Sequence, residues 1–384
     1  MLYAGIDIAK RLHWMAVTDA DGTTVMEARP YENTRDGLAR MVGDLDLLGG
    51  DVAVGMESTG HYWRACFRAL SGGGYAVSVI NPVRTHAARR AANLGRAKTD
   101  RVDCKVIADV VRKEAPAATR VADGKLAELH DLSRFQQVLA ESAADAKIRV
   151  GTLLDQIWPE FSRLFSDTFG GSAMAALRLL ASGSMEGLDD ALAAASRNRF
   201  GSAKGDQVRE SLATTCGIPA TAAHLLQLRI LLDQLDSLRA QSGEVESAMA
   251  ALIAETCPQV LTVPGLGPKT AAQIVAEIGD PARFPDARAV CSYAGLDPRP
   301  CESGDFASEH RRITKTGSCH LRRALYLAAQ ANMRSDNVFR DYYERLRGRG
   351  KPHRLAAVAT ARKMLCVVWA LMVSGEEFDP ERGR

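Results

Sequence analysis

The order of strand-like and helix-like stretches in the first 114 residues constrains the fold of this chain more than any other feature. Short runs rich in β-branched and apolar residues predict strands, and longer runs with helical spacing predict helices between them. In order, we expect strands at 2–8, 12–18 and 23–29, a helix capped by Asn33 and ending near 48, a strand at 52–57, a helix at 61–70, a strand at 75–80, and two helices, one opened by Asn81-Pro82 and one at 98–113. The chain therefore begins with an α/β domain.

Three meandering strands followed by alternating helices and strands are the element order of the ribonuclease-H-like fold. In that topology the first and fourth strands are neighbours at the sheet centre, so Asp7 and Glu57 are expected to meet. Asp100 and Asp103 share one face of the final helix, because residues three apart lie one above the other. Clustered carboxylates repel one another, and oxygen ligands suit divalent cations. The sequence therefore predicts a site for two Mg²⁺ ions.

Each acid also has an ordinary interpretation. The helix at 98–113 is rich in Lys and Arg, so its acids fit a solvated surface, and Glu57 fits a cap for the helix that follows it. Asp7 differs, because an unpaired carboxylate inside an apolar strand is costly to bury. The four acids together favour a functional site more than any one of them does.

Two long amphipathic helices are expected over 125–158 and around 228–252, where apolar residues recur at heptad spacing. They form either an antiparallel hairpin or a dimerising coiled coil. The Ala-, Gly- and Ser-rich stretch at 159–223 predicts short helices and carries no chemical signal. We therefore expect three domains, at 1–120, 121–255 and 256–384, the second a helical region with an insertion.

The C-terminal domain begins with a glycine-rich turn before a helix. Pro264 to Gly267 is expected to form that turn, and the exposed amides at the helix start suit a phosphate. This pattern is typical of the helix-hairpin-helix motif, which grips DNA backbone without reading bases. Its candidate nucleic-acid-binding residues are Gly265, Gly267, Lys269 and Thr270, and an ordinary glycine-rich helix start is the competing interpretation.

Positive charge is concentrated near the C-terminal end of the chain. The net charge is +3, but residues 311–363 carry fourteen Lys or Arg against three acids, which is +11, so the remainder sums to 3 − 11 = −8. Such asymmetry indicates a polyanionic partner, most often nucleic acid. The candidate contacts are Arg311, Arg312, Lys315, Arg322 and Arg323.

Location and redox state follow from simpler features. The sequence has no run of about 18 uncharged apolar residues and starts with a strand-like pattern instead of a signal peptide, so we expect a cytoplasmic protein without membrane contact. Eight cysteines are scattered with no CxxC pair, which predicts neither a zinc site nor a disulfide framework.

Several motifs together resemble one known family. They are GIDIAK, GMESTGHYW, SVINP, KTDRVDCKVIAD, PGLGPKTA, AGLDPRPCESG, ITKTGSCHLRRALY and the closing FD. In order and in kind they resemble the insertion-sequence transposases of the IS one-ten group, which have an N-terminal RuvC-like DEDD domain and a C-terminal transposase domain that bears a serine. The resemblance covers 1–120 and 255–380, and the 159–223 stretch is longer than the helical arm usual in that family.

The resemblance implies the chemistry. Asp7, Glu57, Asp100 and Asp103 would be the Mg²⁺-binding catalytic tetrad. From its position in a loop alone, Ser303 would be interpreted only as a turn former. The resemblance implies that Ser303 is the nucleophile that becomes joined to DNA. The implied partners are donor and target DNA, a structured noncoding bridge RNA that pairs with both, and further copies of the chain, as dimers assembling to a tetramer.

Three other functions remain open from the residues alone. A RuvC-like, metal-dependent and structure-selective nuclease would use water as its nucleophile, with no covalent serine intermediate. A noncatalytic DNA- or RNA-binding scaffold would use the glycine-rich turn alone. An actin-like sugar kinase shares the strand order, but no second glycine-rich phosphate loop follows in the first domain, which disfavours it.

Overall fold

A computed structural model describes residues 1–58, 60–91, 99–121, 124–298 and 313–382, and the backbone of 302–303 and 306–307. Contacts between residues divide the chain into two compact units, Met1–Arg120 and Val121–Arg384. The division into three domains at 1–120, 121–255 and 256–384 stays a prediction.

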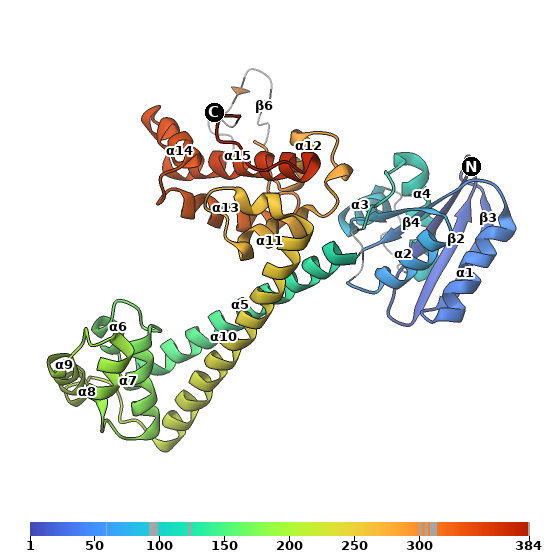
Figure 1. Ribbon diagram of the computed structural model, residues 1–384. Coiled ribbons are helices and arrows are strands. Elements are labelled where there is room, and N and C mark those ends of the chain that lie inside the picture. The colour runs from blue at the N-terminus through green and yellow to red at the C-terminus, as the bar shows by residue number, and fades with distance from the viewer. Residues whose placement is uncertain are drawn as a thin grey trace. The chain divides into compact units, whose positions relative to one another are not determined.

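The first unit is built on one mixed sheet of five strands (Figure 1). The strands are β1 (Leu2–Asp7), β2 (Leu12–Thr18), β3 (Thr24–Glu32), β4 (Val52–Glu57) and β5 (Ala76–Ile80), arranged in the order β3-β2-β1-β4-β5. β1 pairs with β2 antiparallel and with β4 parallel. The predicted α/β class is confirmed, and this strand order fits the ribonuclease-H-like fold.

Helices cover both faces of the sheet. α1 (Arg35–Leu48) and α2 (Trp63–Gly72) pack on one face with Ala4 and Ile6, while α4 (Asp100–Glu114) packs on the other. A short helix, α3 (Pro82–Ala91), precedes α4. Because side chains alternate along a strand, the odd-numbered positions of β1, with Gly5 at their centre, lie on the α4 face.

The predicted helix cap at Asn33 is wrong. Thr34 caps α1 instead, because its side-chain oxygen accepts a hydrogen bond from the Gly37 amide at 3.2 Å. The Asn33 side chain instead donates a hydrogen bond to the Lys10 carbonyl oxygen. Two cap-forming residues in a row cannot be ranked without knowing which one faces the helix.

The second unit contains a long antiparallel hairpin made by α5 (Gly124–Ile157) and α10 (Ala222–Thr256). Lys125 near the start of α5 forms an ion pair with Glu255 near the end of α10, and Gln136 donates to Ser242 at 2.7 Å. The two helices therefore run in opposite directions within one chain. Of the two interpretations of the heptad pattern, the hairpin is the one observed.

Short helices pack at the end of the hairpin, as the sequence predicts for 159–223. They are α6 (Phe161–Leu164), α7 (Gly171–Ser182), α8 (Leu188–Ser196) and α9 (Ser202–Ala213). Trp158, Phe161 and Leu177 are buried there against Leu228 and Leu232 of α10. The insertion therefore has a hydrophobic core of its own around the hairpin end.

The remaining helices pack with α11 (Pro268–Ile278), which lies beside the hairpin (Figure 1). They are the 3₁₀ turns η1 (Pro258–Thr262) and η2 (Pro281–Arg283), and α12 (Ala287–Tyr293), α13 (Cys319–Asn332), α14 (Val338–Gly348) and α15 (His353–Ser374), with the short strands β6 (Glu302–Ser303) and β7 (Phe306–Ala307). Ile274 and Val275 of α11 are fully buried with Leu325 of α13 and Met364 of α15.

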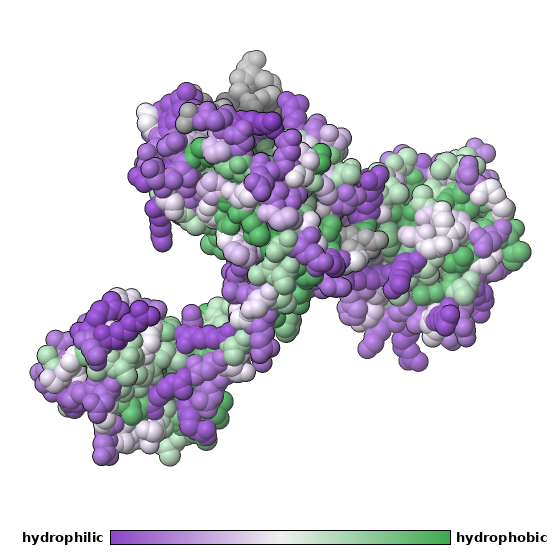
Figure 2. All heavy atoms as spheres, in the orientation of Figure 1, coloured by the Kyte–Doolittle hydropathy of each residue, from purple (hydrophilic) through white to green (hydrophobic). Residues whose placement is uncertain are grey.

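Within the part of the chain that the structure describes, one helix, α15, is long and apolar enough to cross a membrane. Its buried residues, among them Leu365 and Val368, pack into the same hydrophobic core as α11 and α13. Figure 2 shows hydrophilic side chains over much of the visible surface around α14 and α15, where Arg345, Arg347 and Lys351 are exposed. A core helix of a water-exposed domain has this pattern.

Candidate functional site

Asp7 and Glu57 lie at the same end and on the same face of the sheet. In the parallel pair of β1 and β4, Ile6 lies beside Met56, so the next residues, Asp7 and Glu57, are neighbours where both strands end. Asp7 follows Gly5 by two positions and Glu57 follows Gly55 by two, which puts both side chains on the α4 face. The first and fourth strands are therefore neighbours, as predicted, and their backbones place Asp7 beside Glu57.

Helix α4 crosses β1 at very close range. A Cβ atom added to Gly5 would lie 2.0 Å from the Cys104 carbonyl oxygen and 2.2 Å from the Ala108 amide nitrogen, so only glycine allows this approach. Burial first, and then the Asp7 carboxylate, raise the pKa of the Cys104 thiol to about 12.

The two acids of α4 differ in exposure. Asp103 precedes Cys104 and is only 8% exposed, whereas Asp100, at the first position of the helix, is exposed. The structure therefore places Asp7 and Glu57 at the carboxyl ends of β1 and β4 and buries Asp103 on α4, while Asp100 is exposed one turn earlier.

Helix α3 contacts two of these acids. The Thr85 hydroxyl donates a hydrogen bond to Glu57 Oε2 at 2.8 Å, and the Arg89 guanidinium forms an ion pair with Asp103. Thr85 is 6% exposed. These contacts were not predictable, because α3 was expected only as a helix and Arg89 is one of several basic residues on it.

The acids suit Mg²⁺ by donor type, since carboxylate oxygens are its preferred protein ligands. In the described parts of the chain, however, no three His, Cys, Asp or Glu side chains are grouped so as to hold a metal ion. The positive group beside Asp103 is Arg89. The four-acid metal centre therefore stays a prediction.

The backbone of Ser303 lies in a two-stranded antiparallel sheet. It belongs to β6, where Ser303 pairs with Phe306 of β7. The sequence predicted a loop at Ser303, whereas the structure describes two short paired strands on either side of residues 304–305. Arg311 and Arg312 lie outside the described residues, so their predicted contacts with DNA stay predictions.

The glycine-rich turn before α11 is formed as expected. Gly265 has a φ of +71°, and a Cβ atom there would lie 2.3 Å from the Asn332 side chain, so this position requires glycine. Gly267 is the N-cap of α11 and has no atom within 4 Å of an added Cβ, so packing does not require glycine there.

Lys269 forms an ion pair with Glu246 at 2.6 Å, and Thr270 is half-buried beside it. Binding of nucleic acid by this turn stays a prediction.

The other basic candidates differ in what they contact. Lys315 is exposed and has a φ of +56°. Arg323 is exposed, with Glu141 of α5 3.9 Å away. Arg322 donates to the Ala294 carbonyl at 2.8 Å, so its guanidinium holds the chain after α12 against α13. Lys315 and Arg323 present their charge more openly than Arg322 does.

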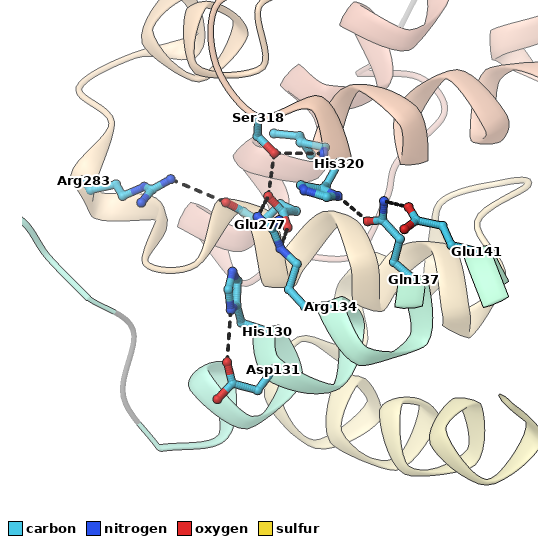
Figure 3. A network of polar contacts seen from close by, with 10 residues as sticks. His130, Asp131, Arg134, Gln137, Glu141, Glu277, Arg283, Ser318 and His320 are labelled. Carbon is cyan, nitrogen blue, oxygen red and sulfur yellow. Dashed lines mark hydrogen bonds and ion pairs between the residues drawn. The ribbon is translucent and has the colours of Figure 1, made fainter. Parts of the chain in front are cut away.

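Glu277 is a buried acid that was not predicted from the sequence, and Figure 3 shows it at the centre of a network of polar contacts. Glu277 of α11 is 4% exposed and accepts hydrogen bonds from Arg134 of α5 at 3.1 Å and from the Ser318 hydroxyl at 2.6 Å. The Ser318 hydroxyl also caps α13 by accepting from the Leu321 amide. Glu277 therefore connects the hairpin to the start of α13. A glutamate within the apolar run IVAEIG was the available signal.

The chain matches two protein-family models. Residues 4–159 match a model of the DEDD type described as "Transposase", and residues 257–344 match one described as "Transposase IS116/IS110/IS902 family". The first match contains Asp7, Glu57, Asp100 and Asp103, and the second contains Ser303.

Similar proteins match over nearly the whole length. The "Insertion element IS110 uncharacterized 43.6 kDa protein" of Streptomyces coelicolor is 30% identical, over 98% of this chain and 95% of that protein. The "Insertion element IS900 uncharacterized 42 kDa protein" of Mycobacterium paratuberculosis is 27% identical, over 99% of this chain and 97% of the relative. The "Pilin gene-inverting protein" of Moraxella bovis is 32% identical over 31% of this chain and 37% of its own length.

Proposed function

This chain belongs to the IS116/IS110/IS902 family of transposases, and from that premise we propose that it cuts and exchanges DNA strands under the guidance of a structured noncoding RNA. A transposase acts on DNA, so its substrate is a phosphodiester. The proposal assigns two separate groups to that substrate, the acids of the first unit and Ser303 of the second.

The observation that supports the proposal is that the elements bearing three of the acids lie at one end of the sheet. Asp7 and Glu57 end adjacent parallel strands, and Asp103 lies on the helix that crosses β1 at Gly5. We assign Asp7, Glu57, Asp100 and Asp103 as the ligands of two Mg²⁺ ions. When bound, Mg²⁺ would supply the positive charge that favours a deprotonated nucleophile and stabilises the leaving oxygen.

Ser303 is proposed as the nucleophile. Its Oγ loses a proton and forms a bond to phosphorus, while the bond from phosphorus to a deoxyribose oxygen breaks and that oxygen takes up a proton. One phosphodiester replaces another, so the strands can be rejoined without ATP. The sequence contains no Walker A motif, which agrees with this balance.

Basic residues near the serine are proposed to hold the DNA. Lys315 and Arg323 are exposed close to it in sequence, and α14 and α15 add exposed arginines such as Arg345 and Arg354. Contacts of Lys and Arg with phosphates give affinity without reading bases. Choice of donor and target sites then rests with the bridge RNA, and dimers that assemble to a tetramer would bring an acid site and a serine from different subunits to one phosphate.

A substitution on α4 tests the role of the acids. Asp103→Asn should lower the rate of strand cleavage by about 100-fold or more, because even groups that only support a metal ligand cost roughly 10- to 100-fold when removed. The measurement is Mg²⁺-dependent cleavage of DNA carrying the joined ends of the insertion element, in the presence of its noncoding RNA.

Asp109→Asn is the matched control. It removes a carboxylate from the same helix, where Asp109 pairs with Arg112 and Lys113 at the surface. Cleavage by this variant should stay within about twofold of the unaltered protein, as exposed ion pairs contribute little. Unchanged cleavage by Asp103→Asn would contradict the proposed role of the acids.

A further inference from the structure

Two cysteine thiols on different helices of the second unit are in contact. Cys291 of α12 and Cys366 of α15 are 75 positions apart in the chain, and their Sγ atoms lie 3.6 Å apart. At this distance one thiol donates a hydrogen bond to the other sulfur. A disulfide bond is roughly 2.0 Å long, so the two sulfurs would have to approach by only about 1.6 Å to form one.

The two thiols differ in exposure and share a positive neighbour. Cys291 is fully buried, whereas Cys366 is half-buried at the edge of the same hydrophobic core. The Arg362 guanidinium, one turn before Cys366 on α15, forms a hydrogen bond with Cys291 and has an Asp297 carboxylate oxygen 3.7 Å away. A positive charge beside a pair of thiols favours the loss of a proton from one of them.

The contact between the sulfurs decides which thiol loses its proton. The hydrogen bond from the Cys291 thiol, and then the charge of Arg362, lower the pKa of the Cys366 thiol to about 7, although burial acts the other way. The same hydrogen bond, and then burial, raise the pKa of the Cys291 thiol far above its usual range. Cys366 is therefore partly a thiolate near neutral pH, with a protonated thiol beside it. Redox-sensitive cysteines typically have this arrangement of an accessible thiolate next to a second cysteine.

We propose that Cys366 and Cys291 form a reversible disulfide when the protein meets a hydroperoxide. The Cys366 thiolate attacks one peroxide oxygen, so a sulfur–oxygen bond forms, the oxygen–oxygen bond breaks, and the departing oxygen takes up a proton. Cys291 then gives up its proton and attacks the Cys366 sulfur, so the disulfide bond forms and the second oxygen leaves as water. The two thiols lose two electrons, and the hydroperoxide gains them.

The disulfide would join α12 to α15 within the unit that contains Ser303. It would also remove the thiolate that faces Arg362 and leave that guanidinium beside Asp297. Formation of the disulfide requires neither the acids of the first unit nor DNA, so this inference is independent of the proposed function.

Peptide mapping of the full chain after oxidation tests the inference. The reduced protein is treated with hydrogen peroxide near neutral pH, the remaining thiols are blocked with N-ethylmaleimide, and the protein is digested without a reductant. Mass spectrometry should find the Cys291 and Cys366 peptides joined, lighter by two hydrogens than the two thiol peptides together, and dithiothreitol should separate them. Cys319, which is exposed on α13, should still carry N-ethylmaleimide when most of the pair is joined.

Recovery of Cys291 and Cys366 as separate thiols would overturn the inference, as would a disulfide that forms no faster than Cys319 is oxidised. This result on the unaltered chain stands even if a cysteine variant does not fold.

Single variants test the order of the two steps. Cys291→Ser should leave Cys366 as a sulfenic acid, which dimedone labels, because the second thiol is missing. Cys366→Ser should leave Cys291 reduced and unlabelled, because that thiol is buried and protonated. Equal dimedone labelling of the two variants would contradict the assignment of Cys366 as the cysteine that reacts with the hydroperoxide.

Discussion

At the scale of single residues, alternation along β1 and β4 decides which acids meet. Asp7 and Glu57 were predictable because each follows a glycine by two positions in a strand whose other face is apolar. The partner of Asp103 was not predictable. Arg89 stands among Arg84 and Arg90 on the same helix, and nothing in the sequence distinguishes the one that faces inward.

The close approach of α4 to β1 predicts a large effect of one methyl group. Gly5→Ala should lower the free energy of unfolding of the first unit by roughly 3 kcal/mol, because its Cβ would overlap the Cys104 carbonyl and α4 would have to move. Pulsed hydrogen exchange in urea follows the unfolding of each unit separately, so it measures the free energy of unfolding of the first unit.

Gly43→Ala is the matched control for that substitution. Gly43 lies within α1, and an added Cβ would meet no atom within 4 Å. It should raise the stability by roughly 0.5–1 kcal/mol, since alanine favours a helix over glycine. Equal effects of the two substitutions would contradict the packing of α4 on Gly5.

A buried histidine predicts acid sensitivity of the first unit. His13 is fully buried and its Nδ1 accepts from the Ala9 amide, and burial lowers its pKa from the ordinary value of 6.5, although a hydrogen bond with Asn33 acts the other way. The unfolded chain therefore takes up this proton more readily than the folded one. The stabilisation is present above pH 6.5 and is lost as the pH falls below it, by up to ~1.4 kcal/mol per pH unit.

His13→Asn tests this prediction, because an asparagine oxygen can occupy the place of Nδ1 and does not titrate. The loss of stability between pH 7 and pH 5.5 should be smaller in this variant than in the unaltered chain. An identical pH dependence in the two proteins would show that His13 does not contribute.

At the scale of elements, the order of strands and helices in the first unit was predicted correctly because the periods of 2 and 3.6 residues are distinct there. The long helices α5 and α10 were also expected, but a heptad pattern is the same whether its partner lies in the same chain or in another one. The ion pair of Lys125 with Glu255 identifies the partner. The contacts of Glu277 were not predictable, because they join three elements far apart in the sequence.

Glu277 predicts a coupling between the hairpin and the start of α13. Glu277→Gln should lower the stability of the second unit by about 2 kcal/mol, because Arg134 loses its charged partner in a mostly buried network. It should also speed amide exchange in the first turn of α13, where Ser318 loses a strong acceptor.

Glu244→Gln serves as the control for this prediction, because Glu244 is exposed on α10 and surface charges contribute little to stability. If exchange in the first turn of α13 is the same in Glu277→Gln and Glu244→Gln, Glu277 does not connect the hairpin to that helix.

At the scale of the whole molecule, the acids and the serine belong to different units of the chain. Composition predicted a polyanionic partner for the C-terminal part, but spacing alone marked Ser303 only as a turn former. The resemblance to a transposase family singled it out. No periodicity in a sequence can reveal whether two units act on one phosphate, because the proposed assembly with DNA and RNA is not encoded in the spacing of residues.

Detection of a covalent protein–DNA adduct tests this central claim most directly. Labelled DNA carrying the joined element ends, incubated with protein, noncoding RNA and Mg²⁺ and then denatured, should give an adduct with the unaltered chain and none with Ser303→Ala or Asp103→Asn. An adduct that persists in Ser303→Ala, or DNA cut to free ends with no adduct in the unaltered chain, would contradict the account, and the second result would favour a nuclease that uses water.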